Sequence, residues 1–298
     1  MKVFIPTAGL GSRLWPLTRK LNKCLLTVDN KPVISHIIDC YPKSTKFVIA
    51  VGFDSKKVID YLQIAHPNTK IRIVKIGKFK GPGSGLKYTL LKSKKYLQEP
   101  FIFHACDTLI KKNKISVNKN WLGISKISKD INYRKVKIKN KKVLSFIEKN
   151  TTNSLNLYIG LAGIKDFDLF WKSLIESKKN IGEICGLKSL IKKKIFTKKY
   201  DWLDTGSLEC LSNYKNNKKN YKINVLEKDG EAIWFVRNRV VKYSLDKTFI
   251  KNRIYRQKIL KKFTPSIIDF KNNYYSYKLI KGEIISKNID EKIFKSLL

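Results

Sequence analysis

The chain has 298 residues, which is long enough for one large domain and a smaller piece. Its hydrophobic content of 43% supports a sizeable core, and no run of about eighteen apolar residues predicts a membrane span. The formal net charge is +40, but only eight of the 63 basic residues are Arg and the lysines spread over the whole chain, which argues against a dedicated nucleic-acid-binding protein.

The chain opens with a short apolar run, residues 3–5, that predicts a buried strand leading into a Gly-rich turn. Such a turn can aim several backbone N–H groups at one phosphate. Gly9 and Gly11 are expected to allow positive φ, and Arg13 and Lys23 add positive charge. The alternative is an ordinary tight turn with a surface arginine. The candidate nucleotide-binding residues of this turn are Ala8, Gly9, Leu10, Gly11, Ser12 and Arg13.

The longer string, residues 9–18 followed by Lys23 and residues 31–34, resembles the signature G-x-G-[ST]-R-[LM]-x-P-L-T-x(4)-K. This signature is typical of the nucleoside-triphosphate:sugar-phosphate nucleotidyltransferases, the pyrophosphorylases and their cytidylyltransferase branch. The resemblance implies that Arg13 and Lys23 bind phosphates and stabilise the charge that develops during transfer. Asn22 stands where the family usually has Pro, so we expect an altered local turn before a retained lysine.

Hydrophobic periodicity predicts alternating strands and helices up to residue 106. The expected helices are 31–41, 54–65 and 86–97, and the expected strands are 46–51, 71–76 and 101–106. This alternation indicates an α/β fold with a Rossmann-like, mostly parallel sheet and helices on both faces. Both Gly-rich loops, residues 9–13 and 77–85, and Asp107 would then lie at the carboxyl ends of strands, where such sheets bind ligands.

From about residue 120 the pattern changes to shorter alternating strands, which predict an antiparallel addition covering the site. The expected strands are 121–127, 136–138, 143–148 and 158–164, followed by helices at 167–177 and 183–193. Residues 212–222 are polar and rich in Asn and Lys, which is typical of a linker. We therefore predict a nucleotidyltransferase domain at 1–222 and a small module at 223–298, which should be separable provided that the interface between them is small and polar.

Two aspartates are candidate Mg²⁺ ligands. Asp107 follows a buried strand, and Asp204 lies in Trp-Leu-Asp-Thr-Gly, which resembles the family's W-x-D-[IVT]-G motif. Either aspartate alone is better explained as a helix cap, but two motifs in the family's order favour a metal site. The resemblance makes Arg13, Lys23, Asp107 and Asp204 the catalytic set.

The acceptor and base sites depart more from the family pattern. Glu148 and Lys149 resemble the E-K-P segment that contacts the acceptor, although Asn150 replaces the proline. Tyr158 and Gly160 resemble the strand that usually carries Asn-x-Gly, with an ordinary strand glycine as the alternative.

The loop expected to face the base, with Gly83 and Ser84, lacks the Gln-rich stretch of uridylyl- and thymidylyltransferases. This difference favours CTP and a phosphocholine-like, polyol or other phosphorylated acceptor.

Residues 223–298 resemble the small N-terminal lobe of aminoglycoside-phosphotransferase or choline-kinase-like proteins, with Lys242 as the strand lysine. The following helix, about 246–262, carries no Glu to pair with it. The alternative is a β-rich capping or dimerisation domain.

The five cysteines are scattered and include no C-x-x-C pair, which predicts free thiols. The N-terminus leads directly into the phosphate loop, which predicts a cytoplasmic location. The three histidines are isolated, and His104 is expected to be an interior residue.

The combined expectation is a Mg²⁺-dependent nucleotidyltransferase for surface polysaccharide biosynthesis, with a nucleoside triphosphate and a phosphorylated small molecule as partners. The alternatives are a UTP- or dTTP-dependent sugar-1-phosphate pyrophosphorylase and a non-catalytic, nucleotide-binding regulatory subunit.

Overall fold

A mixed sheet forms the centre of the first part of the chain. The computed structural model describes residues 1–111, 115–126, 133–147, 156–217, 228–282 and 295. Within these ranges the sheet has the order β5-β4-β1-β6-β11-β8-β12-β10-β9. Its strands are β1 (Lys2–Pro6), β4 (Lys46–Val51), β5 (Lys70–Lys75), β6 (Phe101–His104), β8 (Trp121–Lys126), β9 (Lys135–Lys139), β10 (Lys142–Ile147), β11 (Asn156–Ile164) and β12 (Phe196–Lys199).

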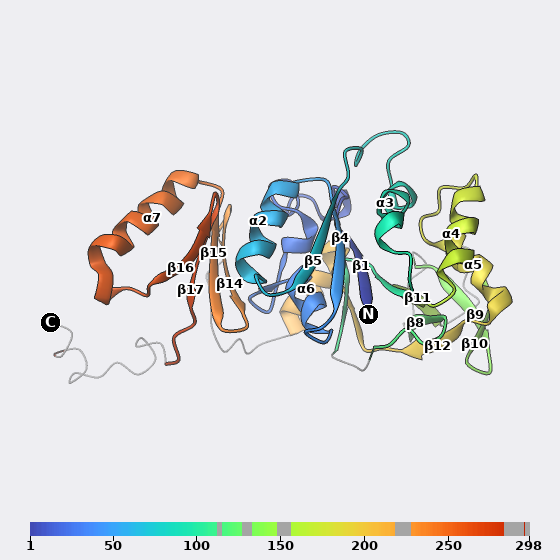
Figure 1. The fold of residues 1–298 in the computed structure, drawn as a ribbon. Helices are drawn as coiled ribbons and strands as arrows, with labels where there is room; N and C mark the ends of the chain where they lie inside the picture. The colour runs from blue at the N-terminus through green and yellow to red at the C-terminus, as the bar shows by residue number, and fades with distance from the viewer. Residues whose placement is uncertain (112–114, 127–132, 148–155, 218–227, 283–294, 296–298) are drawn as a thin grey trace.

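Helices cover both faces of this sheet (Figure 1). They are α1 (Val33–Asp39), α2 (Ser55–Ala65), α3 (Leu86–Ser93), α4 (Phe167–Glu176) and α5 (Ile184–Ser189), with α6 (Leu208–Asn217) following β13 (Trp202–Asp204). Val3 and Ile5 of β1 join the core cluster that contains α1 and α2, whereas Phe4 joins the cluster that contains α3, α4 and α5. This alternation of side chains places β1 between two apolar layers, and the predicted α/β fold is confirmed.

The sheet is parallel from β5 to β6 and then changes direction. β11 is antiparallel to both β6 and β8, β12 is parallel to β8, and β10 and β9 are antiparallel again. The expected antiparallel addition therefore extends the same sheet. The helix expected at 31–41 begins only at Val33, because β3 (Lys31–Pro32) first pairs with β2 (Thr27–Val28).

The predicted linker at 212–222 is wrong over its first half. Helix α6 continues to Asn217, and only the rest of the segment lies outside the described residues. Two side chains anchor this polar helix: Leu211 is buried, and the Tyr214 hydroxyl donates to Asp29 at 2.7 Å. Ser212 and Asn213 are exposed, so the polar composition of this part of the helix is compatible with a helix held by a few anchors.

The C-terminal module is a four-stranded antiparallel sheet, β14-β15-β17-β16, with a helix beside it. Its elements are β14 (Glu231–Val236), β15 (Arg239–Ser244), α7 (Lys247–Leu260), β16 (Ile267–Lys271) and β17 (Tyr274–Lys278). In Figure 1, α2 lies between this sheet and the central one. The module therefore packs directly on a helix of the first part.

The contact between the module and α2 has an apolar, aromatic centre, so it is not the polar interface on which separability was conditional. Trp234 is fully buried, with its ring centroid 5.2 Å from that of Tyr61 on α2, and its indole N–H donates to Thr27 Oγ1 at 2.8 Å. Tyr274 lies in the same cluster and donates its hydroxyl to the Lys57 carbonyl oxygen. The division at residue 222 remains a prediction, but the module shares a core with the first part.

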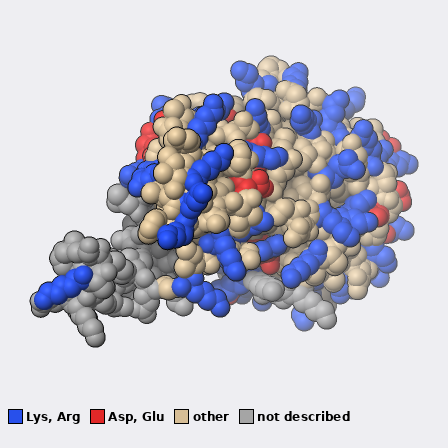
Figure 2. Space-filling model, turned by 60° about the vertical axis from the view of Figure 1, so that its left-hand side comes forward, with Lys and Arg blue, Asp and Glu red and all other residues tan. Residues whose placement is uncertain are grey.

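The surface carries its positive charge in a dispersed way. Figure 2 shows Lys and Arg side chains scattered over one face of the molecule, without a single large basic patch. In the part of the chain that the structure describes, no helix is both long enough and apolar enough to span a bilayer.

Candidate active site

The phosphate loop closes on itself around Gly11. Gly11 has φ of 68°, and a Cβ at this position would lie 3.2 Å from side-chain atoms of both Lys23 and Thr18. The Thr18 hydroxyl donates to the Gly11 carbonyl oxygen at 2.8 Å. Gly9, in contrast, has no positive φ, so that expectation was wrong: the turn needs left-handed backbone at one glycine only.

Asn22 makes the turn before Lys23 rigid by hydrogen bonding. Its side chain is fully buried, accepts from the Cys24 N–H at 3.0 Å, and donates to the carbonyl oxygens of Thr7 and Phe53 at 2.9 and 2.7 Å. Its φ of −62° is also the value at which a proline ring would hold this residue. The residue that departs from the family signature therefore connects Lys23 to the ends of β1 and β4.

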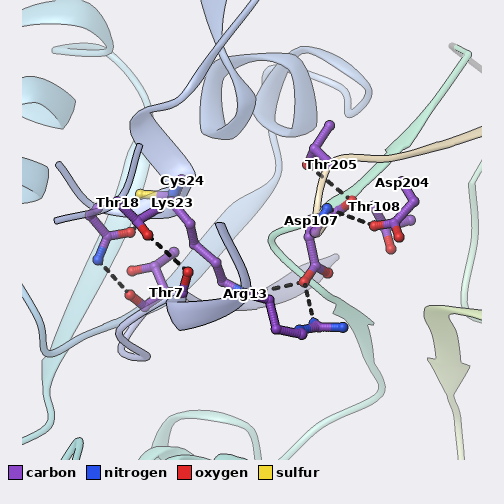
Figure 3. Close-up of polar contacts among 12 residues, drawn as sticks. Thr7, Arg13, Thr18, Lys23, Cys24, Asp107, Thr108, Asp204 and Thr205 are labelled. Carbon is purple, nitrogen blue, oxygen red and sulfur yellow. Dashed lines mark hydrogen bonds and ion pairs between the residues drawn. The ribbon is translucent and has the colours of Figure 1, made fainter. Parts of the chain in front are cut away.

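The two cations of the loop point at Asp107, as Figure 3 shows. Lys23 Nζ lies 3.0 Å from Asp107 Oδ2, and a terminal guanidinium nitrogen of Arg13 lies 4.0 Å from the same oxygen. Burial opposes both charges, but each partner stabilises the other: the pKa of Lys23 is raised and the pKa of Asp107 is lowered. Asp107 is therefore an ionised carboxylate at neutral pH.

Strand pairing brings Asp204 to Asp107 from far along the chain. β7 (Thr108–Ile110) follows Asp107 and pairs antiparallel with β13, so that Thr108 lies opposite Asp204. The Thr205 N–H and hydroxyl both donate to the Asp107 carbonyl oxygen, at 2.9 and 3.1 Å. Asp204 Oδ1 accepts from the Gly206 N–H at 2.7 Å.

Gly206 leaves a space between the two carboxylates. A Cβ on Gly206 would lie 3.0 Å from Asp204 Oδ1 and 3.1 Å from Asp107 Oδ2. Two carboxylates facing one small space are the donor set that Mg²⁺ takes together with substrate phosphates and water. Because burial and the charge of Asp107 raise the pKa of Asp204, a cation between them would relieve a repulsion that is already present. Asp107 and Asp204 therefore fit a divalent metal ion.

Comparison with known proteins agrees with this geometry. The model of the family described as "Nucleotidyl transferase" matches residues 2–220. The chain belongs to this nucleotidyl transferase family. The match covers every element that carries Arg13, Lys23, Asp107 and Asp204 and ends before the C-terminal module, so the kinase-like character expected of that module has no support in it.

Similar curated proteins match this chain over part of their length. The chain is 28% identical over 153 residues to a bifunctional protein GlmU of Methanococcus vannielii, covering 50% of this chain and 35% of that protein. It is 41% identical over 61 residues to a UTP–glucose-1-phosphate uridylyltransferase of Haemophilus ducreyi, covering 20% and 21% of the two chains. The chain spans between about a quarter and half of the length of the GlmU relatives it matches.

Solved structures show the same fold at low identity. UDP-glucose pyrophosphorylase complexed with UDP-glucose matches with a TM-score of 0.61 and 19% identity, over 72% of this chain and 97% of that one. CTP:phosphocholine cytidylyltransferase from Streptococcus pneumoniae matches with a TM-score of 0.64 and 20% identity, over 73% and 99%. These matches show that the chain shares the fold of these structures over about three quarters of its length.

The predicted base-facing loop follows β5 at the carboxyl end of the parallel strands. It is the tall loop between β5 and α3 in Figure 1. Gly83 has φ of 75°, and the Ser84 hydroxyl donates to the Gly81 carbonyl oxygen at 2.7 Å, which closes a tight turn. Asn180, from the α4–α5 connection, donates to the Ser84 carbonyl oxygen at 3.3 Å. That Gly83 and Ser84 face a base remains a prediction.

The predicted acceptor residues are only partly described. Glu148 and Lys149 lie outside the described residues. Tyr158 is buried on β11, edge-on to Phe146. Gly160 has φ of 75°, and a Cβ there would lie 2.7 Å from the Ala105 Cβ and 3.2 Å from Thr108 Oγ1, so this glycine is required for packing beneath Asp107.

Two further residues complete the surroundings of the aspartates. His104 is fully buried between the Tyr41 hydroxyl and the Thr108 carbonyl oxygen, and burial lowers its pKa to about 4, which confirms the expected interior role. Tyr133, which the sequence analysis missed, donates its hydroxyl hydrogen bond to Asp204 Oδ2. No local motif marks Tyr133, because its partner lies 71 residues away.

Proposed function

We propose that this chain is a Mg²⁺-dependent nucleotidyltransferase that transfers a nucleoside monophosphate from a nucleoside triphosphate to a phosphorylated small molecule and releases pyrophosphate. The observation that carries the proposal is the convergence of Arg13 and Lys23 on Asp107, next to which strand pairing places a second carboxylate, Asp204. Membership of the nucleotidyl transferase family supports the reaction class. Transfer between two anionic reactants requires that their negative charge is neutralised and that the reacting groups are held in a fixed geometry, and these four side chains can do both.

Arg13 and Lys23 have two possible anionic partners in this reaction. Without nucleotide both contact Asp107 Oδ2, and the Arg13 side chain is 75% exposed and thus free to reorient. A triphosphate competes for the same cations. When Lys23 and Arg13 move to the phosphates, they stabilise the negative charge that accumulates on the leaving pyrophosphate. Asp107, which binds a metal ion more weakly while it is paired with the two cations, then binds it more strongly.

Asp107 and Asp204 would hold the Mg²⁺ ion, which neutralises phosphate charge when bound. The β7–β13 pairing and the Thr205 contacts keep the two carboxylates at one end of the sheet. Gly206 keeps the space between them open. These residues orient the α-phosphate and the attacking phosphate oxygen for in-line displacement.

We favour CTP as the nucleotide and a phosphorylated sugar, polyol or amino alcohol as the acceptor, for surface polysaccharide biosynthesis. The support is the short loop at 81–86, which has three glycines with positive φ and no Gln-rich stretch. The specific observation in favour of UTP is the name of a relative, a UTP–glucose-1-phosphate uridylyltransferase. UTP-dependent sugar-1-phosphate uridylyl transfer is therefore the second candidate.

The C-terminal module serves as a capping domain in this proposal. Its packing on α2 supports that role. The kinase-lobe alternative has weaker support, because Lys242 lies over the Tyr277 ring at 5.8 Å and α7 contains no acidic residue within Lys247–Leu260.

The test is a pyrophosphate-release screen of four nucleoside triphosphates against phosphorylated sugars, polyols and amino alcohols, with Asp107→Asn as the inactive control. Release with CTP and an amino alcohol or polyol phosphate supports the favoured specificity, and release with UTP and a hexose 1-phosphate supports the second candidate. Nucleotide binding without pyrophosphate release from any acceptor would instead identify a non-catalytic regulatory subunit.

A further inference from the structure

Asp204 faces a second carboxylate across a small space. It is half-buried, and its Oδ1 and Asp107 Oδ2 both lie close to the position that a Cβ on Gly206 would occupy. A carboxylate that binds a metal ion must be held in one orientation, and the groups that hydrogen-bond to it set that orientation.

Two donors hold the Asp204 carboxylate, one on each oxygen. The Gly206 N–H donates to Oδ1, and the Tyr133 hydroxyl donates to Oδ2. Within the described ranges, Tyr133 is the side chain that hydrogen-bonds to Asp204. Every substitution of Gly206 except proline keeps the backbone N–H, so Tyr133 is the donor that a side-chain substitution can remove.

Tyr133 is itself held by neighbours of Asp204. Its ring lies edge-on to Trp202 of β13, with 5.1 Å between ring centroids and an interplanar angle of 79°. Its hydroxyl also lies 3.9 Å from Cys210 Sγ on α6. Trp202 belongs to the same short strand as Asp204, so the strand that packs against the Tyr133 ring also carries the carboxylate to which the Tyr133 hydroxyl donates.

We propose that Tyr133 is a positioning residue of the metal site, whose hydroxyl fixes the Asp204 carboxylate so that a divalent cation can bind between Asp204 and Asp107. The inference rests on the proposed function for the identity of the site, but it concerns metal binding by the protein alone. Residues that orient a metal-binding carboxylate typically change metal affinity by about 10–100-fold when removed.

Tyr133→Phe isolates the hydroxyl, because the ring that packs on Trp202 remains. We expect about tenfold weaker Mn²⁺ binding, measured by electron paramagnetic resonance of free Mn²⁺ in a titration of nucleotide-free protein, with an unchanged melting temperature. In pyrophosphate release, the Mg²⁺ concentration for half-maximal rate should rise about tenfold, while kcat at saturating Mg²⁺ stays within about twofold of wild type. If Tyr133 had a purely structural role, its substitution would not raise the Mg²⁺ requirement while leaving kcat unchanged.

Tyr214→Phe is the matched control, because it removes a tyrosine–aspartate hydrogen bond of 2.7 Å to Asp29, outside the site, and should leave Mn²⁺ binding unchanged. Wild-type Mn²⁺ affinity in Tyr133→Phe would overturn the proposal, as would the absence of any Mn²⁺ binding by the wild-type protein. If the wild-type protein binds Mn²⁺ but releases no pyrophosphate from any acceptor, the proposed function fails, and the titration still decides the role of Tyr133.

Discussion

Replacing Trp234 by Ala should destabilise the first part of the chain as well as the module that contains it. The side chain is fully buried, and its ring lies 5.2 Å from Tyr61, 5.8 Å from Tyr243 and 6.4 Å from Tyr274 between ring centroids. Truncating a buried aromatic side chain to Ala costs about 3–5 kcal/mol, because transfer energy is lost and a cavity remains. At about 2 °C for each kcal/mol in a chain of this size, the melting temperature should fall by roughly 6–10 °C.

The measurement combines thermal denaturation with amide hydrogen exchange of α2. Since Tyr61 of α2 loses its partner, the exchange rates of α2 should rise together with those of β14. Phe263→Ala is the control: this side chain belongs to the same module but is 79% exposed, so both quantities should stay at wild-type values.

An outcome with unchanged α2 exchange and an unchanged melting temperature would refute the shared core and restore the separable module. By the same reasoning, a chain cut after Lys222 should melt at a lower temperature than the full chain, because the cut exposes the apolar side of α2.

Three further outcomes follow from the site. Asp107→Asn should abolish pyrophosphate release, and turnover near wild type at saturating Mg²⁺ would exclude Asp107 as a metal ligand. The melting temperature should fall modestly because Lys23 loses its carboxylate partner, but circular dichroism should show unchanged secondary structure because the Thr205 hydrogen bonds to the residue 107 carbonyl oxygen remain. Arg13→Ala should reduce kcat/KM by about 2–4 kcal/mol, mainly through kcat, and a change in KM alone would make Arg13 a uniform binder. Burial raises the pKa of Glu183 to about 7, so between about pH 4.5 and 7 the folded chain binds one more proton than the unfolded chain. The free energy of unfolding should therefore fall as the pH rises through this range, by at most about 3 kcal/mol. Denaturant titrations at pH 5 and pH 8 should show this fall in the wild-type protein and not in Glu183→Gln, whereas an equal fall in both proteins would show that Glu183 is not its source.

Features that depend on short-range patterns could be predicted from the amino-acid sequence alone. The apolar run at residues 3–5, the Gly-rich turn with Arg13, and the lysine at a fixed spacing all lie within one strand–loop unit, so their geometry follows from local backbone preferences. The alternation of strands and helices likewise predicted an α/β sheet, because periodicity reports which side of each element is buried.

Periodicity does not report what lies against a buried side, and the tertiary structure decided those questions. Asp204 reaches Asp107 only through the pairing of β7 with β13, and Tyr133 reaches Asp204 across 71 residues, so neither contact has a local signature. The apolar side chains of α2 in the sequence indicated that Val58, Tyr61 and Leu62 would be buried. That one side of α2 packs on the module follows only from the fold, because the hydrophobic effect is non-directional and any complementary apolar surface would satisfy it.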